Sequence, residues 1–165
     1  MRVMYYTPIK LLILVVVLLA AGCSHTLSPT AHSAVDLPGG YKEFLRDPEA
    51  ATGRSLMLAG FIVSHKVSRD GTVLTLRPYT MDKRGVPRSP VKGAGELLAR
   101  SDRILNPAHF SSGHLVTLTA TYAGREPRAV ADQQFGRPLF KIGEIHWWPK
   151  EPHYPYGYRY PYRIY

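Results

Sequence analysis

The chain has only one cysteine, Cys23, and few acidic residues: its 165 residues include 12 Asp and Glu against 21 Lys and Arg. A single cysteine excludes a disulfide within the chain and a zinc site made of several thiolates. The shortage of carboxylates gives a formal net charge of +9, which favours anionic partners such as nucleic acid, phospholipid head groups, lipopolysaccharide or acidic glycans. The compartment of the protein decides among these partners.

The sequence also lacks an apolar run long enough to cross a membrane. Its N-terminal run, residues 11–22 (LLILVVVLLAAG), has 12 residues, whereas a membrane-spanning helix needs about 20. Arg2 and Lys10 precede this run, and small residues end it. A positive start, a short apolar core and a small-residue end are typical of a secretory signal peptide. We therefore predict a signal peptide over residues 1–22, and the alternative of a buried core helix fits poorly.

The small residues before Cys23 resemble a bacterial lipobox, with Ala20 at the position where leucine is commonest. The resemblance implies a diacylglycerol thioether on Cys23 and an acyl chain such as palmitate on its amine, since two or more acyl chains anchor a protein stably. An ordinary signal peptide that contains a cysteine is the alternative. Ser24 follows the cysteine, and by the same resemblance the absence of Asp there favours the outer membrane of a Gram-negative bacterium.

Removal of residues 1–22 would take away two basic residues and no acidic one, so that 21 − 2 = 19 basic residues face 12 acidic ones, a net charge of +7. Export makes nucleic acid a poor candidate partner. Residues 23–40 are small, polar and proline-bearing, and this composition predicts a flexible tether between the lipid and the domain.

Four strands are predicted from alternating or β-branched runs. They cover residues 54–67, 72–79, 114–124 and 138–148. The Asp-Gly turn at 70–71 joins the first two into a hairpin, and Gly60 and Gly143 indicate bulges. In the third strand the residues of the buried face are Val116, Leu118, Ala120 and Tyr122. The residues of its expected exposed face are Thr117, Thr119 and Thr121.

The remaining segments predict short helices and connections. Residues 41–47 and 96–102 are helix candidates, the first ended by Pro48. Residues 82–95 carry prolines, glycines and basic residues, which indicates an exposed loop, and residues 105–113 form a turn-rich link. With 14 Gly and 14 Pro, residues 41–150 predict a mainly β domain, a small bent antiparallel barrel that is OB-fold-like with one or two short helices. A β-sandwich is the alternative.

Few residues suggest chemistry. The seven histidines form no H-E-x-x-H pattern, no G-x-S-x-G sequence is present, and His109 and His114 are only a weak metal signal. We expect no enzymatic activity, no cofactor and no metal. Two surfaces remain as candidates for binding. Anionic-ligand candidates in the loop are Lys83, Arg84, Arg88 and Lys92. Contact candidates in the tyrosine- and proline-rich tail, residues 151–165, are Tyr154, Tyr156, Tyr158, Arg159, Tyr160, Tyr162 and Arg163. The alternative for the loop is an ordinary solvated surface, and the alternative for the tail is a disordered segment.

Three stretches and the lipobox resemble the Slp family of outer-membrane lipoproteins, the starvation-inducible lipoprotein family. The stretches are GRSLMLAGFIV, GELLARSDRILNPAHFSSGHLVTLTATYAG and PLFKIGEIHWWP. Asn106 stands where the family usually has Asp, and Phe110 where it usually has Tyr. The resemblance implies an outer-membrane lipoprotein without an established catalytic site. We therefore expect a non-enzymatic lipoprotein of the cell envelope that binds an anionic component or a protein. The alternatives are an assembly factor docking through its tail or, less in keeping, an envelope hydrolase.

Overall fold

The computed structural model describes residues 26–126 and 136–149. Within these ranges it contains six strands and three short helices. The strands are β1 (Ser55–Ser68), β2 (Gly71–Met81), β3 (Pro87–Pro90), β4 (Leu97–Ser101), β5 (Leu115–Arg125) and β6 (Pro138–Trp148). The helices are α2 (Pro29–Ser33), α3 (Gly40–Arg46) and α4 (Pro107–Phe110).

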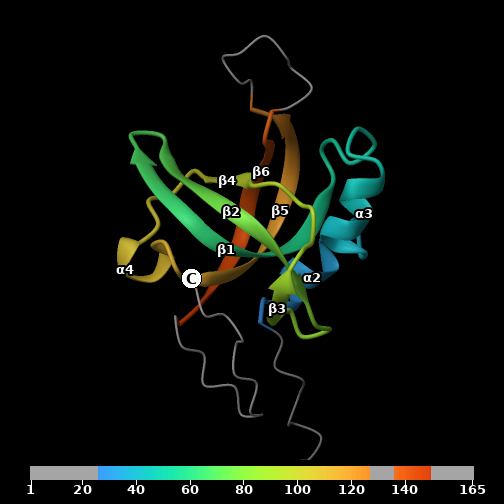
Figure 1. Ribbon diagram of the computed structural model, residues 1–165, viewed down its shortest axis with the longest axis horizontal. Coiled ribbons are helices and arrows are strands. Elements are labelled where there is room, and N and C mark those ends of the chain that lie inside the picture. Colours follow the sequence, from blue (N-terminus) through green and yellow to red (C-terminus); the bar gives the residue numbers. More distant parts are fainter. Residues whose placement is uncertain (1–25, 127–135, 150–165) are drawn as a thin grey trace, which may run out of the picture.

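All six strands belong to one sheet that curls into a ring. Their hydrogen-bonded order is β1-β5-β6-β4-β2-β3, and a further pairing of β1 with β2 closes the ring. Figure 1 shows the long β1–β2 hairpin crossing β5 and β6, with α3 and α4 on opposite sides. The prediction of a mainly β, bent and barrel-like fold is confirmed. The sheet is mixed, however, because β4 and β6 pair in parallel, and the β-sandwich alternative is wrong because the strands form a single sheet.

The strands that alternate in sequence form as predicted, and so do their bulges. In β1 the register with β2 shifts between Ile62 and Ser64, shortly after Gly60. In β6 the shift lies beside Gly143, so that residues on both sides of it contact the core. Phe140 is fully buried, and three further apolar residues of β6 pack against the core. These are Ile142, Ile145 and Trp147.

The prediction that the threonine face of β5 is exposed is wrong. Thr117 is 0% and Thr119 8% exposed. Thr119 accepts a hydrogen bond from the backbone N–H of Glu144 at 3.0 Å, donated by the bulged part of β6. A strand pattern shows which residues are polar, but it cannot show that loops and bulges from elsewhere cover the polar face.

Residues 96–102 form a strand rather than the predicted helix. β4 lies between β2 and β6, and its residues Leu97, Leu98 and Ala99 are all buried. A short apolar run reads equally as a helix or a buried strand, and tertiary pairing on both sides decides for the strand. The loop predicted at 82–95 contains the short edge strand β3. It starts and ends with proline, which sheets tolerate at an edge. The link at 105–113 contains α4, where the Asn106 side chain accepts a hydrogen bond from Ala108 N at 3.0 Å as the N-cap.

Residues 26–40, predicted as part of a flexible tether, pack against the sheet. Leu27 and Leu37 are each 3% exposed, and Leu37 forms a bridge with Leu56 of β1. Asp36 Oδ2 accepts hydrogen bonds from the backbone N–H and the hydroxyl of Ser55, both at 2.8 Å. The composition of the segment is that of a linker, but two leucines and one aspartate hold it in place.

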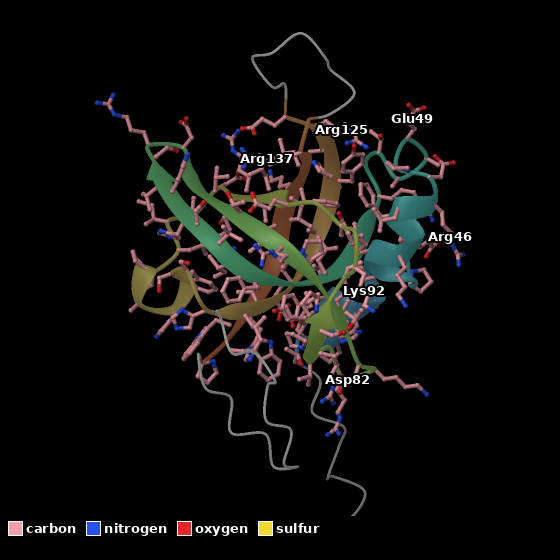
Figure 2. The ribbon with its side chains drawn as sticks, viewed as in Figure 1. Arg46, Glu49, Asp82, Lys92, Arg125 and Arg137 are labelled. Atoms are coloured by element: carbon pink, nitrogen blue, oxygen red, sulfur yellow. The ribbon has the colours of Figure 1, made fainter. Side chains whose placement is uncertain are left out.

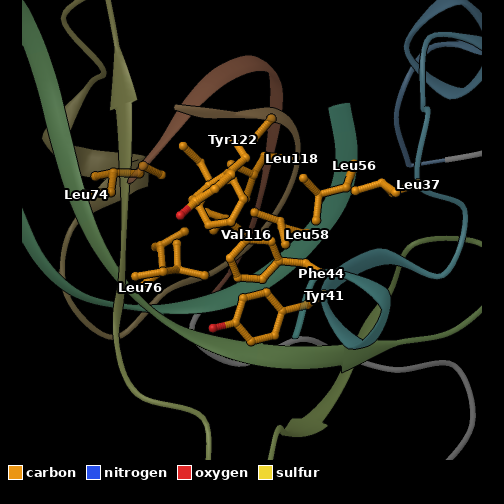
Figure 3. Close-up of a cluster of buried hydrophobic side chains, with 14 of the residues drawn as sticks. Leu37, Tyr41, Phe44, Leu56, Leu58, Leu74, Leu76, Val116, Leu118 and Tyr122 are labelled. Carbon is orange, nitrogen blue, oxygen red and sulfur yellow. The ribbon is translucent and has the colours of Figure 1, made fainter. Parts of the chain in front are cut away.

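The core fills the inside of the ring and takes its aromatic side chains from α3 as well as from the strands. Arg46, the last residue of α3, points away from the sheet (Figure 2). The opposite face inserts Phe44, whose ring centroid lies 4.8 Å from that of Tyr122 and 5.2 Å from that of Phe140. Tyr41 stacks on Phe44 at 5.4 Å (Figure 3). Burying one such side chain contributes about 1.5–3 kcal/mol, so the predicted short helix at 41–47 is part of the core.

Candidate functional site

The basic loop, defined here as residues 82–92, is organised by one carboxylate. Asp82 Oδ1 accepts hydrogen bonds from the backbone N–H groups of Arg84 at 2.9 Å and Val86 at 3.0 Å, and its other oxygen pairs with Arg88. Burial alone would raise the pKa of Asp82, but the hydrogen bonds from Val86 and Arg88 outweigh it and the pKa is lowered. Asp82 therefore stays ionised and holds the loop in shape.

All four basic side chains of this loop are exposed, but their surroundings differ. Asp82 offsets the charge of Arg88. Lys83 and Arg84 lie in the turn itself, where their backbone is fixed and their side chains reach solvent. Lys92 follows β3, one residue after Val91 donates its backbone N–H to Pro78 O at 2.9 Å. The structure thus brings Lys83, Arg84 and Arg88 together around one turn and leaves Lys92 on the next segment.

The N-terminal segment is hydrogen-bonded to this loop. The backbone N–H and the hydroxyl of Thr26 both donate to the carbonyl oxygen of Arg84, at 3.3 and 2.6 Å. Cys23 lies outside the described residues, three positions before Thr26. The described part of the N-terminal segment therefore begins at the basic loop.

A second connection fixes the same segment to β6. Ser28 donates its backbone N–H to Glu144 Oε1 at 2.9 Å and its hydroxyl to Oε2 at 2.6 Å. These two hydrogen bonds lower the pKa of Glu144, since both favour its ionised form. Ser28 Oγ also accepts from Ala31 N at 3.1 Å as the N-cap of α2. One serine thus starts the helix and attaches it to the sheet.

The end of β6 lies beside the basic loop because of a buried threonine. Thr117 donates its hydroxyl to Gly85 O at 2.6 Å and accepts a hydrogen bond from Trp148 Nε1 at 3.0 Å. The described part of the chain ends one residue later, at Pro149. The tail at 151–165, with all its contact candidates, lies outside the described residues. The segments towards both termini therefore leave the described domain next to the basic loop.

The residues that make these connections were not predicted as functional, and no local signal marks them. Thr26, Ser28 and Thr117 are ordinary hydroxyl residues in the sequence, and Glu144 is one acid in a strand. Their roles depend on partners far away in the chain: Ser28 and Glu144 are 116 residues apart.

The two histidines considered as a weak metal signal lie around Trp147 instead. The His109 ring stacks on Trp147 with centroids 4.4 Å apart and an interplanar angle of 4°. His114 meets the same indole edge-on at 6.1 Å, and its Nδ1 lies 3.1 Å from Ser111 O. Within residues 26–126 and 136–149, no three His, Cys, Asp or Glu side chains gather closely enough to hold a metal ion.

No helix in the described part of the chain has both the length and the apolar character needed to cross a membrane. Among solved structures, the chain is similar to the "Crystal structure of a putative aspartyl-tRNA synthetase from Leishmania major Friedlin", with 11% sequence identity and a TM-score of 0.41. That similarity covers 63% of this chain and 19% of the other. No curated protein matches the chain. The model of the outer membrane lipoprotein Slp family matches residues 20–165.

Proposed function

We propose that this chain, which belongs to the outer membrane lipoprotein Slp family, is a non-enzymatic envelope protein whose basic loop rests on an anionic membrane surface. A lipid on Cys23 would hold it there. The observation that carries the proposal is the pair of hydrogen bonds from Thr26 to Arg84 O. They support a geometry in which the lipid and the cations of the loop reach the same surface.

The charges of the loop fit such a surface. Lys and Arg side chains near an anionic leaflet each contribute about 1 kcal/mol to membrane binding. Lys83, Arg84 and Lys92 are exposed, while Arg88 also serves Asp82 within the fold. Because residues 26–40 are packed on the sheet, only about three residues separate the lipid from the domain. A domain held this closely keeps its loop within the range over which membrane charge acts.

The tail is proposed to lie at the same interface. Trp148 leads towards it and is tied through Thr117 to the basic loop. Tyrosine and arginine suit a membrane interface, where rings sit at the level of the head groups and guanidinium groups meet phosphate. In the alternative of an assembly factor, the tail binds a partner protein. Deletion of residues 151–165 separates these, since loss of a co-purified protein with unchanged vesicle binding would favour docking.

The lipid anchor is tested in cells. Residues 1–22 are exchanged for a signal peptide of a soluble exported protein and Cys23 is changed to Ser, so that no lipid can be attached. We expect this protein to move from the membrane to the soluble fraction. The control carries the same foreign signal peptide but keeps Cys23 and the lipobox residues before it, and it should stay with the membrane. Full retention of the unlipidated chain on washed membranes would contradict the anchor.

The surface is tested on the unlipidated chain with vesicles of phosphatidylcholine, with and without phosphatidylglycerol. Changing Lys83 and Arg84 to Glu should weaken binding to the anionic vesicles by about thirty-fold or more, the loss expected when two favourable charges are removed. The matched control changes Lys66 and Arg69 to Glu, two exposed cations at the end of the β1–β2 hairpin. Equal loss in both double variants would show that only net charge matters and would sink the proposal.

A further inference from the structure

A cavity of about 510 Å³ lies where residues 32–42 meet the start of β1 and the end of β2. This is within the usual range of small-molecule sites, about 300–1,000 Å³. Three separate parts of the chain supply its walls: residues between 32 and 42, which run from α2 into α3, Met57 of β1, and residues 79–83, which run from the end of β2 into the basic loop. Of its lining residues, only Asp82 and Lys83 belong to the basic loop of the proposed function.

Part of the wall is apolar. Val35, Met57, Tyr79 and Met81 line the cavity and are only partly exposed, and the buried Tyr41 lines it as well. His32 and Thr80 add polar groups to the lining. Aromatic rings and thioethers of this kind suit a flexible hydrocarbon, because methionine adapts its shape to what it contacts.

A glycine in the cavity wall allows the start of α3 to pack closely on β1. Gly40 has a φ of +59° and starts α3. A Cβ at this position would lie 3.0 Å from Met57 O and 3.7 Å from Met81 Cε. A larger residue would therefore be strained and would also push against two of the lining residues.

The charged residues of the lining differ in whether they already have partners within the fold. Lys42 from α3 and Lys83 from the basic loop both line the cavity and are exposed. Asp82 lines it too, but its carboxylate is already engaged by Arg88 and by the backbone of the turn. An anionic group entering the cavity would thus meet two ammonium groups and a carboxylate that has its own partners.

We propose that this cavity binds the single acyl chain of an anionic amphiphile. The chain lies against Val35, Met57 and Met81, and the carboxylate or phosphate of the head group contacts Lys42 and Lys83. Lys83 belongs to the loop proposed to face the membrane, so an acyl chain from the lipid phase has a short path to the cavity. That the amphiphile comes from the membrane rests on the proposed function. That it has an acyl chain and an anionic head group rests on the lining of the cavity alone.

The test uses the lipidated mature protein in nanodiscs of phosphatidylcholine. Three diazirine-bearing probes of equal chain length are added: a fatty acid, a lysophosphatidic acid and a fatty alcohol. We expect both acids to cross-link to peptides that contain Met57 or residues 79–83, and the alcohol to label these peptides about tenfold less, the effect of losing one charge-assisted contact. Labelling by one acid alone identifies the head group, carboxylate or phosphate. Equal labelling by the alcohol, or labelling spread over the whole surface, overturns the proposal.

Two variants and a control make the test specific. Lys42→Glu should reduce labelling by the acids about tenfold while leaving vesicle binding unchanged, because Lys42 is not part of the basic loop. Val35→Trp should reduce labelling by all three probes by filling the cavity. Lys66→Glu, at a distant exposed site, should change nothing. Urea unfolding confirms that each variant is folded. Undiminished labelling in both Lys42→Glu and Val35→Trp overturns the proposal.

The protein's own lipid is the competing occupant. If the unlipidated Cys23→Ser chain takes the probes and the lipidated chain does not, the cavity holds the acyl chain of Cys23 itself, which contradicts binding of a separate amphiphile. Vesicle binding of the Lys83 and Arg84 double variant, measured without probe, tests the proposed function. Its result is separate from the cross-linking result, which tests the cavity.

Discussion

The two ends of the ring carry similar cations in different surroundings. At the end away from the basic loop, Arg137 pairs with Glu126 at 2.9 Å and with Glu96 at 3.9 Å. Arg125 donates to Gly136 O at 3.0 Å. At the basic loop a single carboxylate, Asp82, is ion-paired with one of four cations in the part of the chain that the structure describes. Figure 2 shows both ends, with Arg125 and Arg137 opposite Asp82.

The difference shows which cations stabilise the fold through their side chains. The arginines of the far end join the end of β5 to the start of β6 and satisfy nearby oxygens. Lys83 and Arg84 of the basic loop lie in a turn that Asp82 holds through the backbone, and their side chains extend to solvent. A count of charges alone would treat both ends as equal candidates for an anionic surface.

The largest effect is expected at Thr117, which connects the basic loop to β6. Thr117→Val keeps the shape but leaves Gly85 O and Trp148 Nε1 without their partner. Each buried polar group left unsatisfied costs about 1–3 kcal/mol, so the free energy of unfolding should fall by about 2–3 kcal/mol in urea titrations followed by tryptophan fluorescence. Thr121→Val, on the same face but half-buried, is the control. A loss below that of Thr121→Val would show that the connection contributes little.

A smaller effect is expected from Glu144→Gln, which removes the charged acceptor of two Ser28 donors. Because Glu144 is partly exposed, the loss should be about 0.5–1 kcal/mol. Hydrogen exchange should speed up at the start of α2 and stay unchanged in the β1–β2 hairpin. Equal exchange at Ser28 in Glu144→Gln and in the wild type would contradict the role of Glu144 in holding the N-terminal segment.

The same residue makes the attachment sensitive to acid. The folded-state pKa of Glu144 is lowered by its hydrogen bonds with Ser28, so its stabilising contribution is complete above about pH 4.3 and is lost as the pH falls through the folded-state pKa. Burial lowers the pKa of His146, although Glu144 opposes this. The folded state therefore binds a proton at His146 less readily than the unfolded state. The free energy of unfolding falls for this reason as the pH drops below about 6.5. Urea midpoints should decline in both steps. Glu144→Gln should make the lower step smaller without removing it, because the pKa of Asp82 is lowered as well.

The smallest effect is expected at the far end of the ring. Arg137→Gln removes two ion pairs whose side chains are 37–45% exposed, so the loss of stability should be about 0.5 kcal/mol. Binding to anionic vesicles should stay within about twofold of the wild type, well under the tenfold that 1.4 kcal/mol represents. A loss of vesicle binding as large as that of the Lys83 and Arg84 variant would erase the distinction between the two ends.

Local patterns predicted the parts of the fold that depend on near neighbours. The hairpin of β1 and β2 follows from an Asp-Gly turn between β-branched runs, and β5 from strict alternation. The bulge at Gly143 followed from the change of parity between Ile142 and Ile145. These features form because each residue's preference agrees with its place in the sheet.

Prediction failed where distant contacts decide. The run Leu97–Ser101 became a strand because β2 and β6 pair with it on both sides. The segment 26–40 became ordered because Leu27 and Leu37 found a buried surface that its composition does not reveal. Thr117 and Thr119 became buried because the basic loop and the β6 bulge cover them.

By itself the sequence determined the lipobox-like cysteine, the basic loop, the tyrosine-rich tail and the main strands, because each is a property of adjacent residues. Only the tertiary structure decided that the basic loop meets both chain exits at one end of the ring. That meeting depends on hydrogen bonds between residues 58 positions apart, for Thr26 and Arg84, and 31 apart, for Thr117 and Trp148. Closure of the ring brings these partners within bonding distance, and no local preference encodes it.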